Sequence, residues 1–290
     1  MAEVIDVLRS REKRRFLEAY DSAMEAWPSE RKSALIATSF GRTQVHQCGP
    51  EDAPPIILLH GMGATSAMWH PCVVALQRKH RIVALDTIGD VGRSLPERVP
   101  RNVKDFTHWI VEVMDELGLV RAHFVGLSYG AWLSANMAVS RSERVDRLVL
   151  LAPAAVFARI GVGFLFRAMS ASFIRSPHLI RSFREWLVHD PRALVDPADL
   201  IEVGLRARKF APIPPPSCLS DDQLRSIKAE TLLMIGEHEP VTRPIRAISR
   251  AEHLVRKIET VLVPNAGHML TGEAPERVNA KVTEFLSRTN

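Results

Sequence analysis

The stretch Gly126-Leu127-Ser128-Tyr129-Gly130 constrains the fold more than any other part of this 290-residue sequence. It follows the apolar, strand-like residues 123–125 and precedes residues 131–138, whose small and apolar side chains predict a helix. A serine between a strand and a helix must occupy a tight and strained turn, and flanking glycines remove the Cβ atoms that would collide there. Such a turn raises the serine hydroxyl above a sheet and directs the free N–H groups of the new helix toward it. We therefore predict that Ser128 is a nucleophile.

Short apolar segments alternate with amphipathic segments along most of the chain. Strands that alternate with helices indicate a largely parallel sheet with helices on both faces, which is an α/β fold. The first two strands flank Gly41 and predict a hairpin. The pattern predicts eight strands, at residues 34–39, 43–47, 55–59, 81–86, 123–126, 145–152, 231–235 and 259–263, and helices near residues 66–79, 103–117, 244–256 and 275–287.

Two segments lie outside this alternation. Residues 156–220 are helical in pattern, rich in arginine and end in a proline-rich run, so we expect an inserted helical cap, or lid, between two strands of the sheet. Residues 1–32 predict a helical extension whose apolar side chains pack against the core, although they are also compatible with a homodimer contact. The α/β core is then formed by residues 33–155 and 221–290.

Charge and cysteine usage restrict the partners. The net charge is +5, but arginine is scattered and no dense basic block with interleaved aromatics occurs, so we do not expect nucleic-acid binding. Cys48, Cys72 and Cys218 have no metal-binding spacing and indicate free thiols in a reducing compartment. The first residues are too charged for a secretory signal, and no uninterrupted apolar stretch could span a bilayer. We expect a cytoplasmic protein with no stable membrane insertion, no cofactor and no metal.

A serine nucleophile needs a base within hydrogen-bonding distance and an acid that orients the base. His268 follows the predicted strand at 259–263, and Glu239 follows the predicted strand at 231–235. The carboxyl ends of parallel strands gather their loops at one edge of the sheet, so the three side chains are expected to meet. Their order along the chain, nucleophile then acid then histidine, matches that of α/β-hydrolase triads.

From about residue 33 onward the sequence resembles the α/β-hydrolase fold superfamily. His60-Gly61-Met62-Gly63 resembles its oxyanion loop, and residues 86–94 resemble its D-x-x-G-x-G-x-S loop with one extra residue. The sequence of residues 86–94 and the long predicted N-terminal helix most resemble those of bacterial carboxylesterases. Glu239 departs from the usual aspartate, but glutamate is an accepted triad acid on this fold.

The resemblance implies a role for each residue. Ser128 attacks a carbonyl carbon, His268 takes and returns the proton, and Glu239 orients His268. The backbone N–H groups of Met62 and Tyr129 hold the oxyanion, and water then hydrolyses the acyl-enzyme. The predicted activity is therefore hydrolysis of small or medium carboxylic esters, with a small-molecule ester as the partner.

Several alternatives stay open at this point. Glu237 is the rival for the acid. A carbon–carbon bond hydrolase acting on dienoates or diketones could use the same triad, as could a lactonase, thioesterase or acyltransferase, and a ligand-binding receptor could keep the triad as a pocket. Trp69, Phe157 and Met269 are the predicted substrate-binding residues, since a cap over Ser128 would enclose them with the site.

Overall fold

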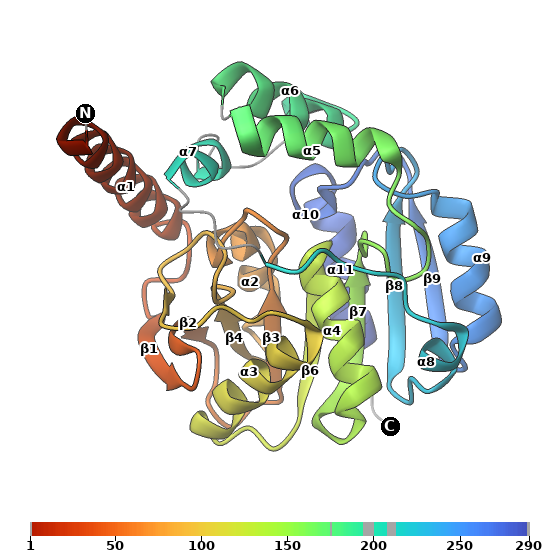
Figure 1. The fold of residues 1–290 in the computed structure, drawn as a ribbon. Helices are drawn as coiled ribbons and strands as arrows, with labels where there is room; N and C mark the ends of the chain where they lie inside the picture. The colour runs from red at the N-terminus through yellow and green to blue at the C-terminus, as the bar shows by residue number, and fades with distance from the viewer. Residues whose placement is uncertain (1, 175, 194–199, 208–212, 289–290) are drawn as a thin grey trace.

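The computed structural model describes residues 2–174, 176–193, 200–207 and 213–288. Within these residues, nine strands form one sheet, and eight of them follow the order β1-β2-β4-β3-β6-β7-β8-β9 (Figure 1). The ninth, β5 (Leu95–Pro96), pairs with β2 and was missed by the prediction of eight strands, because two residues are too few to show an alternating pattern. The other strands are β1 (Lys32–Thr38), β2 (Gly41–Cys48), β3 (Pro55–Leu59), β4 (Arg81–Leu85), β6 (Ala122–Leu127), β7 (Val145–Leu151), β8 (Glu230–Gly236) and β9 (Ile258–Val263).

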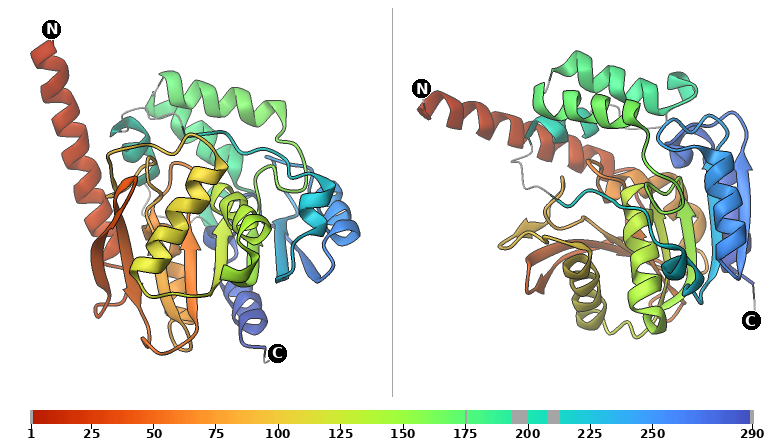
Figure 2. Two further views of the ribbon diagram at one scale, coloured as in Figure 1. Left: turned by 60° about the horizontal axis from the view of Figure 1, so that its bottom comes forward. Right: turned by 45° about the vertical axis from the view of Figure 1, so that its right-hand side comes forward.

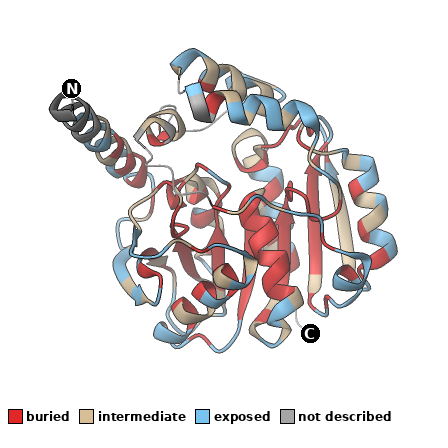
Figure 3. Ribbon diagram, viewed as in Figure 1, coloured by how far each residue is buried: buried red, intermediate tan, exposed pale blue. Residues whose placement is uncertain are grey.

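Neighbouring strands are parallel along the part of the sheet that runs β4-β3-β6-β7-β8-β9, whereas β2 pairs with β1, β4 and β5 in the antiparallel sense. Its central strands are buried along nearly their whole length, which requires cover on both faces (Figure 3). Successive side chains of a strand point to opposite faces, so Ile57 and Leu59 join one core while Ile56 and Leu58 join the other.

Helices from different parts of the chain supply that cover. The core around Ile57 and Leu59 is closed by α3 (Val103–Glu116), α4 (Tyr129–Ser140), α8 (Asp221–Arg225) and α9 (Pro244–Leu254). The core on the opposite face is closed by α1 (Ala2–Met24), α2 (His70–Leu76), α10 (Leu270–Glu273) and α11 (Pro275–Leu286). The short 3₁₀ turns η1 (Ser66–Trp69) and η2 (Ser142–Arg144) precede α2 and β7. The predicted α/β architecture is confirmed.

Helix α1 packs against the core through the carboxyl-terminal half of its length, and its amino end projects beyond the rest of the molecule (Figure 2). The hydroxyl of Tyr20 donates to Asp86 Oδ2 at 2.9 Å and lies 2.7 Å from His46 Nε2. Burial, reinforced by the nearby Asp86 carboxylate, raises the pKa of Tyr20 well above its ordinary value, so the hydroxyl keeps its proton. A buried hydrogen-bond network therefore joins α1 to the loop that follows β4.

A helical insertion separates β7 from β8 and lies across the carboxyl ends of the strands (Figure 1). Its described elements are α5 (Val162–Ile174), α6 (Pro177–Leu187), η3 (Pro191–Ala193) and α7 (Leu200–Ala207). Parts of the predicted cap, residues 175, 194–199 and 208–212, lie outside the described residues. None of the helices in the described ranges is long and apolar enough to cross a membrane.

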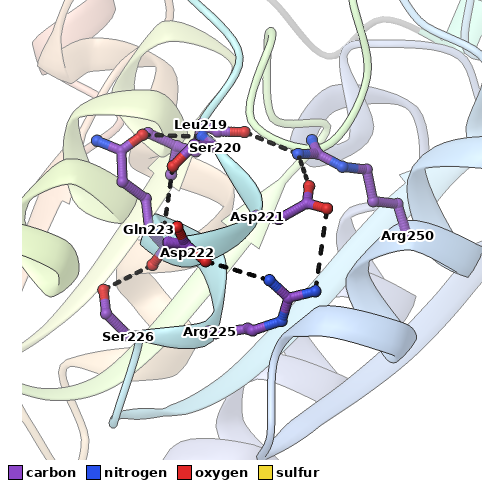
Figure 4. Close-up of polar contacts among 8 residues, drawn as sticks. All are labelled: Leu219, Ser220, Asp221, Asp222, Gln223, Arg225, Ser226 and Arg250. Atoms are coloured by element: carbon purple, nitrogen blue, oxygen red, sulfur yellow. Dashed lines mark hydrogen bonds and ion pairs between the residues drawn. The ribbon is translucent and has the colours of Figure 1, made fainter.

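Arg250 on α9 contacts both ends of the insertion. Its guanidinium donates to the carbonyl of Phe157 at 3.2 Å and to that of Leu219 at 2.8 Å, and it pairs with Asp221 at 2.7 Å. Figure 4 shows the returning end, where Ser220 and Gln223 form a reciprocal capping box that starts α8. The segment that leaves the core and the segment that re-enters it are therefore both hydrogen-bonded to Arg250.

Candidate active site

Ser128 occupies a strained turn between β6 and α4. Its φ of 54° and ψ of −108° lie outside the regions that most residues adopt, and its N–H donates to the carbonyl of Leu151 at 2.9 Å. A Cβ on Gly130 would overlap the carbonyl of Leu59, and a Cβ on Gly126 would overlap the carbonyl of Gly130. Glycine at both positions is thus what allows the turn to form.

Ser128, His268 and Glu239 lie in one hydrogen-bonded row. His268 Nε2 is 2.8 Å from Ser128 Oγ, and His268 Nδ1 is 2.8 Å from Glu239 Oε2. Glu239 lies in the loop after β8 and His268 in the loop after β9, and these loops meet because the two strands are parallel neighbours. The side chains of His268 and Glu239 are only 6% and 1% exposed, so water does not compete for their hydrogen bond. A carboxylate can only accept a hydrogen bond, so the proton of the neutral imidazole lies on Nδ1. Nε2 therefore carries no proton and can accept one from the serine hydroxyl.

The rival acid Glu237 lies elsewhere. Its side chain is 48% exposed, and its carboxylate accepts the N–H of Asn265 at 3.2 Å. Glu239 instead turns inward, where its second oxygen accepts the N–H of Val241 at 2.7 Å. The two residues differ because Glu237 continues directly from the end of β8, whereas Glu239 lies in the turn that follows.

The oxyanion loop after β3 is held by the loop after β4. The N–H of Gly63 donates to Asp90 Oδ2, and the N–H of Ser66 donates to Asp86 Oδ1, both at 2.9 Å. His60 Nε2 accepts the N–H of Thr87 at 2.9 Å, which places the His60 proton on Nδ1, where it donates to the Gly61 carbonyl at 2.8 Å. The role of His60 is thus to brace this loop.

Met62 and Tyr129, the two predicted oxyanion donors, flank Ser128. Met62 lines the same cavity as Ser128, and its N–H has no hydrogen-bond acceptor in the part of the chain that the structure describes. Tyr129 follows Ser128 directly at the start of α4, and its buried hydroxyl donates to the carbonyl of Pro214 at 3.0 Å. Met62 thus lines the cavity of Ser128 and Tyr129 adjoins Ser128 in the chain, and their role as oxyanion donors stays a prediction.

Asp90 is expected to affect turnover more than substrate binding. Its carboxylate accepts the N–H groups of both Gly63 and Val91, and asparagine could keep only one of these bonds. We expect Asp90→Asn to lower kcat about tenfold with little change in KM, less than the 10²–10³ lost with an oxyanion donor itself. Steady-state kinetics on a p-nitrophenyl ester checks this, with the exposed Asp52→Asn as the matched control. A raised KM at unchanged kcat would contradict it.

A cavity of about 150 Å³ opens above the row. Ser128 and His268 form part of its floor, and Met62 and Met269 form part of its wall. The inserted helices cover it with mostly apolar side chains, which are Phe164, Ala168, Ala171, Phe183, Arg184, Leu187, Leu200 and Ile201.

Of the three predicted substrate-binding residues, only Met269 lines this cavity. Trp69 and Phe157 are 0% and 2% exposed, and each packs in a hydrophobic core instead. That part of the prediction is corrected, since apolar aromatic side chains near the site are stabilised as much by the core as by a pocket. Phe183 and Met68 also line the cavity, although their sequence pattern did not predict it. Apolar helical spacing marked both segments but could not indicate which face turns toward Ser128.

Hydrogen bonds join the carboxyl end of α6 to the loop that carries His268. The N–H of His268 donates to the carbonyl of Leu187 at 2.7 Å. Glu273 accepts the N–H of Gly267 at 3.0 Å and the N–H of His189 at 2.6 Å. These bonds make the position of His268 depend on the inserted helices as well as on β9.

Comparison with known proteins agrees with this geometry. The sequence pattern of the alpha/beta hydrolase family matches residues 56–281. Carboxylesterase YbfK of Bacillus subtilis (strain 168) is 36% identical over 279 residues, which cover 94% of this chain and 93% of the relative. The crystal structure of naproxen esterase (carboxylesterase NP) from Bacillus subtilis has a TM-score of 0.91 at 33% identity and covers 95% of this chain and 98% of its own.

A more distant match is the meta-cleavage product hydrolase from Pseudomonas fluorescens IP01, with a TM-score of 0.75 at 26% identity, covering 89% of this chain and 98% of its own. The predicted resemblance to α/β-hydrolases, and to bacterial carboxylesterases among them, is confirmed. With the sheet order, the serine turn and these matches in agreement, the chain belongs to the alpha/beta hydrolase family.

Proposed function

We propose that the protein is a serine carboxylesterase that hydrolyses small or medium carboxylic esters. The observation that carries this proposal is the row Ser128–His268–Glu239 at the floor of an apolar cavity. The similarity to carboxylesterase YbfK and to naproxen esterase supports the same reaction. The chain's own side chains make up a nucleophile, a base and an orienting acid in contact.

The steps of ester hydrolysis follow from the arrangement of Ser128, His268 and Glu239. The Ser128 oxygen attacks the ester carbonyl while its proton passes to His268 Nε2, and Glu239 stabilises the resulting imidazolium at Nδ1. The N–H groups of Met62 and Tyr129 donate to the oxyanion. His268 then gives its proton to the leaving alkoxide, and an alcohol departs. Water, deprotonated by His268, attacks the acyl-enzyme and releases the carboxylic acid and free Ser128.

The helical insertion acts as the cap in this proposal. We assign residues 156–220 to it, residues 1–32 to the N-terminal extension and the rest to the α/β core. The bonds from Arg250 to Phe157 and Leu219 support these boundaries, since they join the points where the chain leaves and re-enters the core. The cap covers Ser128, which stays partly exposed, and supplies about half of the apolar side chains that line the cavity.

Buried thiols support a reducing, cytoplasmic location. Cys48 and Cys72 are free and buried, and burial raises their pKa values to about 11 and about 12, so neither forms a reactive thiolate. The partner of the enzyme is then a small ester. A homodimer through α1 stays a prediction.

A substrate panel tests the function. We expect purified protein to hydrolyse short and medium p-nitrophenyl esters, and to turn over a ring-cleavage dienoate far more slowly, because the cavity is small and largely apolar. Faster turnover of the dienoate would instead establish the carbon–carbon bond hydrolase. A protein that is inert to every ester and unlabelled by a fluorophosphonate probe would make the proposal wrong.

A further inference from the structure

Helix α5 is apolar on two opposite faces. Arg167 is its only charged residue among Val162–Ile174. Phe164, Ala168 and Ala171 recur at helical spacing and line the cavity above Ser128. A helix that is apolar all round is normally buried all round, so the second face needs an explanation.

That second face is open to solvent. Val162, Phe166 and Met169 are 80%, 73% and 58% exposed, and Leu165 beside them is 46% exposed. At about 100° per residue, this row lies on the side of the helix opposite the cavity-lining row. We call these four side chains the α5 outer face. Figure 2 shows α5 and α6 as the outermost layer above the carboxyl ends of the strands, with no other described helix over them.

The inserted segment that carries the α5 outer face is positively charged. Residues 156–192 contain six arginines against one glutamate and one aspartate, an excess of four charges in a chain whose net charge is +5. Arg159, Arg167 and Arg181 are exposed, and none of them forms an ion pair with a residue in the described ranges. Arg167 lies 5.3 Å from the ring of Trp186, which holds its charge at the edge of α5.

We propose that the α5 outer face docks on an anionic lipid surface. Exposed apolar side chains flanked by arginines match the interfacial region of a bilayer, where apolar groups enter the acyl boundary and guanidinium groups meet phosphates. A second copy of the chain is a poorer occupant, because a two-fold pairing of this face would bring unpaired arginines of like charge together. The docking goes beyond the proposed hydrolysis of dissolved esters, since it places the cavity beneath α5 next to esters held in a lipid layer.

Co-sedimentation with vesicles tests the docking. We expect the full-length protein to bind phosphatidylcholine vesicles that contain about one quarter phosphatidylglycerol, to bind pure phosphatidylcholine more weakly, and to lose binding as salt is raised. Phe166→Ser combined with Met169→Ser should weaken binding about tenfold or more, since both side chains lose their apolar burial. Arg159→Gln and Arg181→Gln should each weaken it roughly fivefold.

Matched controls come from the opposite end of the sheet. Val120→Ser removes an apolar side chain that is 81% exposed, and Lys228→Gln with Lys257→Gln removes two exposed cations there. These variants should bind vesicles like the wild type. All variants should hydrolyse a water-soluble p-nitrophenyl ester normally, which shows that the fold and the triad are intact and separates this test from that of the esterase activity.

Three results would overturn the docking proposal. One is a wild-type protein that binds no vesicles, and another is equal binding by the Phe166→Ser/Met169→Ser variant. The third is a stable dimer in sedimentation equilibrium that Phe166→Ser dissociates, because a second copy would then be the occupant of the face.

Discussion

Ser128→Ala is expected to lower kcat for p-nitrophenyl esters by about 10⁵- to 10⁶-fold. The hydroxyl is the only group of the row that can form the acyl-enzyme, and His268 Nε2, 2.8 Å away, loses the proton that it would accept. What remains is the contribution of the oxyanion loop and of substrate binding. Initial-rate assays measure the loss, and intact-mass analysis after treatment with a fluorophosphonate should show no adduct.

The matched control is Ser140→Ala at the carboxyl end of α4, the helix that begins directly after Ser128. Its hydroxyl donates to the carbonyl of Asn136 at 2.7 Å and has no contact with the row, so the activity and labelling should stay near those of the wild type. Full activity or continued labelling of Ser128→Ala would place the nucleophile elsewhere.

Glu239→Gln is expected to lower kcat by about 10⁴-fold, the loss typical of an orienting acid changed to its amide. Glu239 Oε1 accepts the N–H of Val241, so a glutamine that keeps this bond presents its NH₂ group to His268 Nδ1. An NH₂ group donates, and the imidazole must then carry its proton on Nε2, facing Ser128. That tautomer cannot accept the serine proton.

Glu237→Gln is the matched control, because it makes the same chemical change two residues away. Its carboxylate is half-exposed and contacts Asn265 rather than His268, so we expect nearly unchanged kcat. Circular dichroism should show both variants folded. Loss of activity in Glu237→Gln, with Glu239→Gln active, would reverse the assignment of the acid.

Local patterns were sufficient for most of the fold. The longer strands and helices of the core occur where alternation and helical spacing predict them, because each of these elements buries one or two faces in the two cores. The exceptions are the short helices α8 and α10, which were not predicted, and β5, whose two residues form a strand only because they pair with Gly41 and Arg42. Such a pairing depends on a distant partner and has no local signal.

The cavity was harder to predict than the row of polar side chains. The chain order of Ser128, Glu239 and His268 at the ends of parallel strands indicated that they would meet. Trp69 and Phe157 were expected in the pocket but lie in the cores, since an aromatic side chain gains similar free energy from either environment. Deciding between them requires the position of each helix relative to the sheet.

The sequence by itself thus determined the strained turn at Ser128, the α/β architecture and the chemistry of the row, because glycine placement, hydrophobic periodicity and side-chain type act over short distances. Only the tertiary structure decided which face of α5 lines the cavity, which stays exposed, and how the inserted helices bind the loop of His268. Those outcomes depend on packing between segments far apart in the chain, and a helix that is apolar on both sides carries no local signal of which side turns inward.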